Sequence, residues 1–182
     1  MANFALIKAT FLKIFFIGMR LFTKAERSSF PYWFAHWCAF NMTAIMCKHW
    51  RVGYLFHDWY KPWLRIFLPY SKVQKFHRLH SRHHLEWIEN RLERIRDKKN
   101  YNKLYNCLRK FDWYGMLIDW ECSRHTKLES PLTAYEEMEK IFGDPEHMLG
   151  KFPMIYQYMW IIKTHYMKTA LKELGLWPEK QV

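Results

Sequence analysis

The sequence predicts an all-α protein, a compact bundle of about six to eight helices, on three observations. Apolar residues recur three and four positions apart along almost the whole chain, which is the spacing of one helical face. The 182 residues include only 6 glycines and 7 prolines, which argues against a turn-rich β sandwich or a glycine-dependent nucleotide-binding fold. No segment has the pattern of a strand, and the length suits one domain.

The first expected element is an amphipathic helix over residues 1–27 that packs on the domain. Its apolar positions run from Phe4 to Met19 on one helical face, and Lys13 and Arg20 interrupt the most apolar part of the segment. That part is too short to span a bilayer, and no small-residue cleavage site follows it. The alternative interpretation is a basic interfacial helix that touches a membrane.

Residues 28–128 are the expected core, and local signals divide them into helices. Ser28 and Ser29 before Pro31 predict a helix start, because serine caps a helix and proline suits its first turn. Gly53 and Pro69 mark breaks. The helices expected in this part run approximately over residues 32–48, 55–60, 71–97 and 101–125.

Residues 129–182 are expected to add helices that pack on the core. Ser130 and Pro131 predict the start of a further helix, with Ser130 as its cap and Pro131 in its first turn. Thr133 and Glu136 add the spacing of a capping box, and this helix is expected to end near Gly143. A short helix from Asp144 and a long one over residues 152–174 complete the expected bundle.

Positive charge is concentrated in the middle of the chain. The net charge is +12, and residues 61–110 contribute +10 of it, from 14 basic minus 4 acidic side chains. Such a field attracts anions: a phosphorylated small molecule, a nucleic acid or an acidic membrane. The more ordinary interpretation of a single basic run, such as residues 94–99, is a solvated helix face.

The four cysteines form no CxxC pair. They therefore indicate buried free thiols rather than a disulfide framework or a zinc ribbon, which is typical of a reducing compartment. Together with the absence of a predicted transmembrane segment, this favours a cytoplasmic protein.

The histidines carry the main functional signal. Four of the ten lie within eight positions: His77, His80, His83 and His84. On a continuous helix, His80 and His84 would have the HxxxH spacing that brings two imidazoles to one metal ion, and His83 would lie about 100° away from His84. The ordinary interpretation is a basic solvated face. Apolar residues beside the cluster, such as Leu85, show that this segment also buries one side, which favours metal binding.

Two further elements carry ligand-type side chains. His57 and Asp58 are adjacent and precede an expected helix end, where neighbouring side chains can converge. Asp119 lies within the apolar stretch 116–120, and a buried carboxylate needs a partner. That partner is either a metal ion or an arginine of the helix expected over residues 71–97. Imidazole and carboxylate ligands together suit Mn, Fe, Zn or Mg.

The order of these elements resembles the H…HD…H…H…D signature of the HD-domain superfamily, whose members are helical metal-dependent phosphohydrolases. The chain more closely resembles a group of small bacterial and phage proteins of undetermined function. These carry an early histidine, an HDxxK element, a segment ending HHxxW or HHxxY, and a later Asp-Trp. Here the matching pieces are His36, residues 57–61, residues 80–87 and 119–120. The group usually has serine where Tyr60 stands.

The resemblance implies an HD-like core that holds one or two divalent ions, with Mn, Fe, Zn, Ni, Co and Mg as the candidates. The metal ligands that it implies are His36, His57, Asp58, His80, His83, His84 and Asp119. The first ion would take His36, His57, Asp58 and Asp119, and the second would take His80 and His84, with Asp58 as a bridge. His49 is the alternative to His36 as first ligand.

The function implied is hydrolysis of a small phosphorylated compound, with a nucleotide as the first candidate. Asp58 and Lys61 would be catalytic, and Lys61, Arg78 and Arg82 would bind the substrate phosphate. One alternative is a non-catalytic helical protein that binds metal or nucleotide. Another is a basic nucleic-acid-binding protein that stacks bases on aromatics such as Tyr101 and Trp113, although no known nucleic-acid motif is present.

Overall fold

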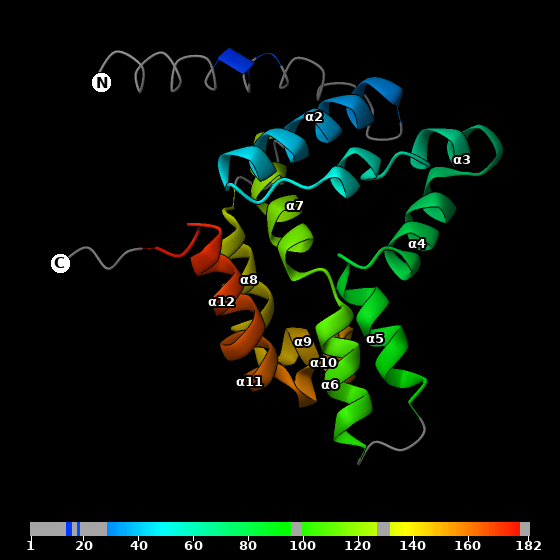
Figure 1. Cartoon of the computed structure of the whole chain (residues 1–182). Helices are drawn as coiled ribbons and strands as arrows, with labels where there is room; N and C mark the ends of the chain where they lie inside the picture. The colour runs from blue at the N-terminus through cyan, green and yellow to red at the C-terminus, as the bar shows by residue number, and fades with distance from the viewer. Residues whose placement is uncertain (1–13, 16–17, 19–28, 96–99, 127–131, 179–182) are drawn as a thin grey trace, which may run out of the picture.

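The computed structural model describes residues 14–15, 18, 29–95, 100–126 and 132–178, and these residues form helices and no strand (Figure 1). The predicted all-α fold class is therefore confirmed. In chain order the elements are α2 (Phe30–Met46), the 3₁₀ helix η1 (Val52–Phe56), α3 (Lys61–Phe67), α4 (Tyr70–His80), α5 (Leu85–Glu93), α6 (Tyr101–Lys110), α7 (Trp113–Thr126), α8 (Ala134–Phe142), α9 (Pro145–Lys151), α10 (Pro153–Gln157), α11 (Met159–Ile161), the π-helix η2 (Ile162–Met167) and α12 (Lys168–Glu173).

The predicted N-terminal helix over residues 1–27 lies outside the described residues, apart from three positions. Of these, Phe15 packs against the hydrophobic core and Ile14 is 64% exposed. No helix in the described part of the chain is long and apolar enough to cross a membrane.

Helix α7 lies at the centre of the fold. It packs along α2 and contacts α8 and α12 (Figure 1). Its side chains Met116, Leu117 and Ile118 are almost fully buried, and burial of each such side chain stabilises the fold by roughly 1.5–3 kcal/mol. Because α7 has core on several sides, a carboxylate such as Asp119 is held in the interior of the protein, where it needs a partner.

Capping side chains begin α2 and α8, although α8 starts at Ala134, later than the predicted start at Ser130 and Pro131. The Ser29 hydroxyl accepts a hydrogen bond from the Tyr32 amide at 3.4 Å, so α2 starts at the expected serine. At α8, the Glu136 amide donates to the Thr133 hydroxyl at 3.2 Å, and the Thr133 amide donates to the Glu136 carboxylate at 2.8 Å. This is the predicted capping box. Such a cap is worth roughly 0.5–2 kcal/mol.

The predicted single helix over residues 71–97 is wrong, because α4 ends at His80 and α5 begins only at Leu85. Ser81 and His84 have extended backbones, with φ/ψ of −90°/124° and −110°/138°. The Ser81 hydroxyl lies 2.9 Å from Nδ1 of His77, a local contact that competes with continuation of the helix. Neither glycine nor proline marks this break. The expected HxxxH face is therefore not formed.

The predicted helix over residues 101–125 is also divided, at Phe111 and Asp112. Phe111 has an extended ψ of 143°, and the Asp112 carboxylate accepts a hydrogen bond from the Gly115 amide at 3.0 Å. A Cβ at Gly115 would come within 2.5 Å of that carboxylate and would displace it. In the same way, the predicted helix over residues 152–174 is a succession of α10, α11, η2 and α12.

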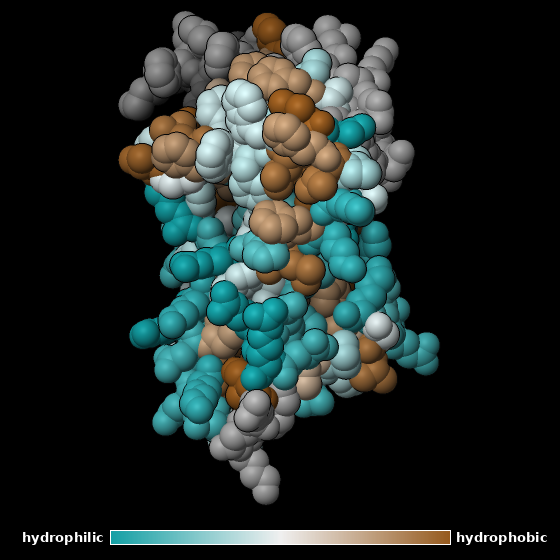
Figure 2. All heavy atoms as spheres, turned by 90° about the vertical axis from the view of Figure 1, so that its right-hand side faces the viewer, coloured by the Kyte–Doolittle hydropathy of each residue, from teal (hydrophilic) through white to brown (hydrophobic). Residues whose placement is uncertain are grey.

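Helix α3 presents an apolar surface to solvent. Trp63, Ile66 and Phe67 are 62%, 68% and 81% exposed. Figure 2 shows hydrophobic side chains gathered on the upper part of the face that includes α3, above a largely hydrophilic lower part. Single exposed apolar residues are ordinary, but three on a seven-residue helix form a continuous patch.

Candidate metal centre

The turn between η1 and α3 directs two consecutive side chains to one interior point. Asp58 adopts a positive φ of 59°, a left-handed conformation that aspartate tolerates better than most residues. The side chains of His57 and Asp58 are only 4% and 2% exposed, and Nε2 of His57 lies 3.6 Å from Oδ2 of Asp58. The predicted convergence of the adjacent pair is thus present.

One face of α2 holds this turn in place. Three of its side chains, spaced four residues apart, donate hydrogen bonds to backbone carbonyls of the turn region. These bonds are Trp33 Nε1 to Asp58 O at 2.9 Å, Trp37 Nε1 to Leu55 O at 2.9 Å, and Asn41 Nδ2 to Tyr54 O at 3.3 Å. They satisfy backbone acceptors and stabilise the turn against the helix.

Phe40 sets the orientation of the His57 ring. The two rings stack with centroids 3.6 Å apart and an interplanar angle of 3°. Burial lowers the pKa of His57 from 6.5 to about 3, so the imidazole is neutral at physiological pH. Among the described residues, Nε2 of His57 has no hydrogen-bond partner. A neutral imidazole with a free nitrogen is the ligand form of histidine.

His36 and Asp119 adjoin this ring from α2 and α7. Oδ1 of Asp119 lies 2.9 Å from Nε2 of His36 and 3.8 Å from Nε2 of His57. On its other side, Nδ1 of His36 lies 3.5 Å from the Thr126 hydroxyl, which helps to orient the ring. The predicted proximity of Asp119 to His57 is confirmed. His49, the alternative to His36, instead stacks on a tyrosine ring and belongs to none of the candidate ligand groups.

A second histidine group lies on the other side of Asp58. Ligand atoms of His77, His83 and His84 all lie within 4.8 Å of one another. Nε2 of His77 lies 2.6 Å from Nε2 of His84 and 3.1 Å from Oδ1 of Asp58, and Nε2 of His83 lies 3.9 Å from the same oxygen. Burial lowers the pKa of His77 and of His84 well below 6.5, so both rings are neutral.

His80 lies outside this group, contrary to the predicted ligand set. Its side chain is exposed, its Nδ1 lies 2.8 Å from the Phe76 carbonyl oxygen, and its ring stacks on Phe76. His77 takes its place, because α4 turns His77 inward and ends before a continuous helix could align His80 with His84. The sequence signal for His77 is its spacing of four from Val73, the other buried residue of α4.

Hydroxyl groups fix the orientation of His77. The hydroxyl oxygens of Tyr60 and Ser81 lie 2.7 and 2.9 Å from its Nδ1, and 2.8 Å from each other. With Nδ1 engaged there, Nε2 faces Asp58. Hydrogen bonding of the second ring nitrogen is what orients histidine ligands in metal sites.

Asp58 lies between the two groups as a carboxylate. Burial alone would raise its pKa, but His57 and Lys61 act in the opposite direction and lower the pKa well below 3.8. Three of the buried side-chain atoms that have no hydrogen-bond partner among the described residues belong to this site: Nε2 of His57, Oδ1 of Asp58 and Nε2 of His83. Orphaned buried polar atoms are costly and rare. Their convergence, and their N and O chemistry, fit a divalent ion.

The predicted phosphate-binding cations are divided among three places. The Lys61 ammonium forms an ion pair with Asp58 Oδ2. Arg78 lines a cavity beside the histidines and pairs with Glu86 at 3.0 Å. Arg82 lines a separate depression next to His57 and Asp58. The structure therefore does not bring these three cations together.

Cys122 is a neighbour of the site that the sequence pattern did not single out. Its thiol donates to the Asp119 carbonyl oxygen at 3.2 Å and lies 3.8 Å from Nδ1 of His36. His36, Asp119 and Cys122 form one of the three groups whose geometry could hold a metal ion. Its place one helical turn after Asp119 is the signal that could have drawn attention to it.

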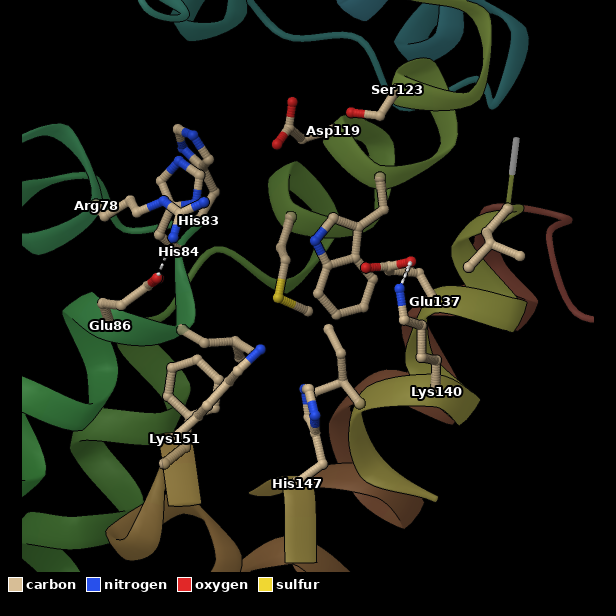
Figure 3. A pocket seen from close by; sticks show the side chains of 16 residues that line it. Arg78, His83, His84, Glu86, Asp119, Ser123, Glu137, Lys140, His147 and Lys151 are labelled. Carbon is tan, nitrogen blue, oxygen red and sulfur yellow. Dashed lines mark hydrogen bonds and ion pairs between the residues drawn. The ribbon is translucent and has the colours of Figure 1, made fainter. Parts of the chain in front are cut away.

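The cavity beside the cluster has a volume of about 370 Å³ (Figure 3). His83, His84 and Asp119 lie on one side of it, and residues of α8 and α9 lie on the other. A cavity of this size accommodates a small organic ligand. The candidate ligand atoms are thus next to a space in which a substrate can be bound.

Comparison of the chain with protein-family models, with curated proteins and with solved structures gives no match. Function therefore has to be inferred from the geometry and chemistry of the site itself.

Proposed function

We propose that this protein is a metal-dependent phosphohydrolase that acts on a small phosphorylated compound, with a nucleotide as the first candidate. The observation that supports this most directly is the convergence of three buried ligand atoms that have no hydrogen-bond partner among the described residues, on His57, Asp58 and His83, of which His83 also lines the cavity. One ion would be held by His36, His57, Asp58 and Asp119, and a second by His77, His83 and His84, with Asp58 between them.

Five imidazoles and two carboxylates form this proposed ligand set. A divalent ion there would supply Lewis acidity toward a phosphoryl oxygen and would lower the pKa of a bound water. Two such ions with two carboxylates leave a formal charge of +2, which favours an anionic substrate. The ligand chemistry suits Mn, Fe, Zn, Ni, Co or Mg.

The remaining residues would orient groups and balance charge. The Lys61 ammonium pairs with Asp58 Oδ2 and helps to keep that carboxylate in place. Arg78 lies where the guanidinium can contact a phosphate in the cavity, and Arg82 lies in the depression next to His57. Lys61 would have to leave Asp58 in order to contact substrate.

The Lys61–Asp58 ion pair favours a second candidate, a buried polar network without catalysis. With this pair and the His36–Asp119 contact, much of the charge in the site is balanced by the protein itself.

The nucleic-acid alternative has less support, because Trp113 is only 4% exposed and is therefore core, although Tyr101 is 72% exposed.

A turnover screen tests the proposal. Nucleotides, cyclic nucleotides and sugar phosphates are incubated with the wild type and each candidate metal. Asp58→Asn keeps the shape and the tolerance of a positive φ but removes the charge. His165→Asn is the control, because His165 is exposed and lies on η2 outside the site. We expect hydrolysis by the wild type and control, with a loss of roughly 10²-fold or more in Asp58→Asn. No turnover above the Asp58→Asn background would favour the non-catalytic candidate.

A further inference from the structure

The cavity beside the histidine cluster has a second wall, made by α8 and α9, that the proposed metal chemistry does not use. His147 and Lys151 of α9 both line it. Since they are four residues apart, they share one face of α9. Figure 3 shows their side chains approaching the cavity from the side opposite Asp119.

Among the described residues, some of the basic side chains around the cavity have an acidic partner and one does not. Arg78 pairs with Glu86 at 3.0 Å, and the Lys140 ammonium lies 4.0 Å from a Glu137 carboxylate oxygen (Figure 3). Within the described ranges, Lys151 forms no ion pair with an acidic side chain. The α9 wall therefore has a cation that is not neutralised by an acidic side chain of the described residues, and that cation lines the cavity.

Apolar side chains line the cavity together with the polar ones. Among them are Met116, Trp120 and Phe152, and Met116 and Phe152 are at most 8% exposed. A ligand that spans the cavity would thus contact hydrocarbon and an indole ring as well as polar groups. That is the usual composition of a small-molecule site, in which a few polar groups fix the orientation.

The α9 wall is held firmly against the core. Met148, on the same helix, is fully buried, and Asp144 caps the helix start by accepting from the Glu146 amide at 3.0 Å. Directly after α9, the Met154 amide donates to the Glu89 carboxylate of α5 at 2.7 Å. These contacts hold the backbone that carries Lys151 in place before any ligand binds, which reduces the entropic cost of binding.

We propose that His147 and Lys151 form a second anion subsite, so that the ligand is an organic phosphate with a second anionic group separated from the first by a largely apolar middle. The phosphate end rests on the function proposed above. The second end rests on the cavity, the unneutralised Lys151 and the apolar side chains that line the cavity. The chemistry recognised is a distal carboxylate, phosphate or sulfonate, since an ammonium contacts each of these as a point charge.

Binding of non-hydrolysable phosphonates tests the subsite without requiring turnover. Alkylphosphonates of increasing chain length, each paired with an analogue that ends in a carboxylate, are titrated calorimetrically in the presence of Mn²⁺ or Zn²⁺. At the chain length that spans the cavity, we expect the carboxylate analogue to bind the wild type roughly tenfold more tightly, the effect of one charge-assisted hydrogen bond.

Variants of Lys151 test whether α9 causes the preference for the carboxylate analogue. Lys151→Gln should abolish it and leave binding of the plain alkylphosphonate unchanged, and Lys151→Arg should retain it. Lys172→Gln, an exposed lysine of α12 away from the cavity, is the matched control and should behave like the wild type. No carboxylate preference at any chain length, or a preference that survives in Lys151→Gln, would overturn the subsite, as would failure of both analogues to bind. A preserved preference without hydrolysis of any phosphoester would overturn the hydrolase proposal alone.

Discussion

Nε2 of His57 lies 3.8 Å from Oδ1 of Asp119, across the space between the turn after η1 and the central helix α7. Both side chains are nearly inaccessible to solvent, and each comes from an element whose position α2 determines. The distance is too long for a hydrogen bond and suits two ligands of one ion, because metal–ligand bonds of about 2 Å place neighbouring ligand atoms roughly 3–4 Å apart.

Substitution of single histidines should show whether His77, as in the structure, or His80, as predicted from the sequence, is a metal ligand. We expect His77→Ala to weaken metal binding at least tenfold, because it removes a ligand nitrogen beside Asp58. His80→Ala should bind metal as the wild type does, because His80 is exposed and lies outside the ligand groups. Metal affinity is measured by competition with a fluorescent chelator. Equal losses in both variants would contradict the assignment of His77.

Removing the stacking partner of His57 should weaken metal binding without removing a ligand. In Phe40→Leu the His57 ring loses its parallel neighbour at 3.6 Å, so we expect roughly a tenfold loss of metal affinity, together with a core-packing cost of about 1–3 kcal/mol. The matched control is Phe142→Leu, since Phe142 is also 1% exposed but lies on α8. Chemical denaturation and chelator competition measure both quantities. Equal loss of affinity in the two variants would show a general effect of destabilisation.

Stability of the metal-free protein should fall as the pH falls below about 6.5. Burial lowers the pKa of His57 to about 3, so between these values the unfolded chain binds a proton that the folded protein does not. The unfolded state is therefore favoured as the pH falls, by about 1.4 kcal/mol per pH unit for each such group. Denaturant titrations of chelator-treated protein at pH 7.5 and pH 5 measure the change. We expect the free energy of unfolding to change less between these two pH values in His57→Gln than in the wild type. An equal change in that variant would contradict the role of His57.

Much of the first ligand group could be predicted from the sequence, because its members are identified by order and chemistry. The adjacent His57 and Asp58, the carboxylate Asp119 within an apolar helix and the earlier His36 meet at one point. Their predicted proximity is confirmed, and their role as metal ligands stays a prediction. Helix starts with a capping residue, such as Thr133, were also predictable from a local signal.

The second ligand group, His77, His83 and His84, could not be predicted from the sequence, because no glycine or proline marks the helix end after His80. The break is accompanied by local contacts to the buried His77: the Ser81 hydroxyl lies 2.9 Å from its Nδ1, and the extended backbone of His84 brings the His84 ring to its Nε2. Because helical periodicity was continued through this break, the predicted ligand set contains His80, whereas the structure places His77 beside Asp58. The α9 wall of the cavity was equally unpredictable, since its approach to the histidines depends on packing of distant segments.

Metal content tests the central claim most directly. Protein purified without chelator or nickel resin is analysed by mass spectrometry for the wild type, the double variant His57→Ala/Asp58→Ala and the control His165→Asn. Circular dichroism verifies that each is folded. We predict one or two divalent ions per chain in the wild type and control, with loss of at least one in the double variant. A folded double variant with unchanged stoichiometry, or a wild type that takes up none of Mn, Fe, Co, Ni, Zn or Mg, would contradict the metal centre.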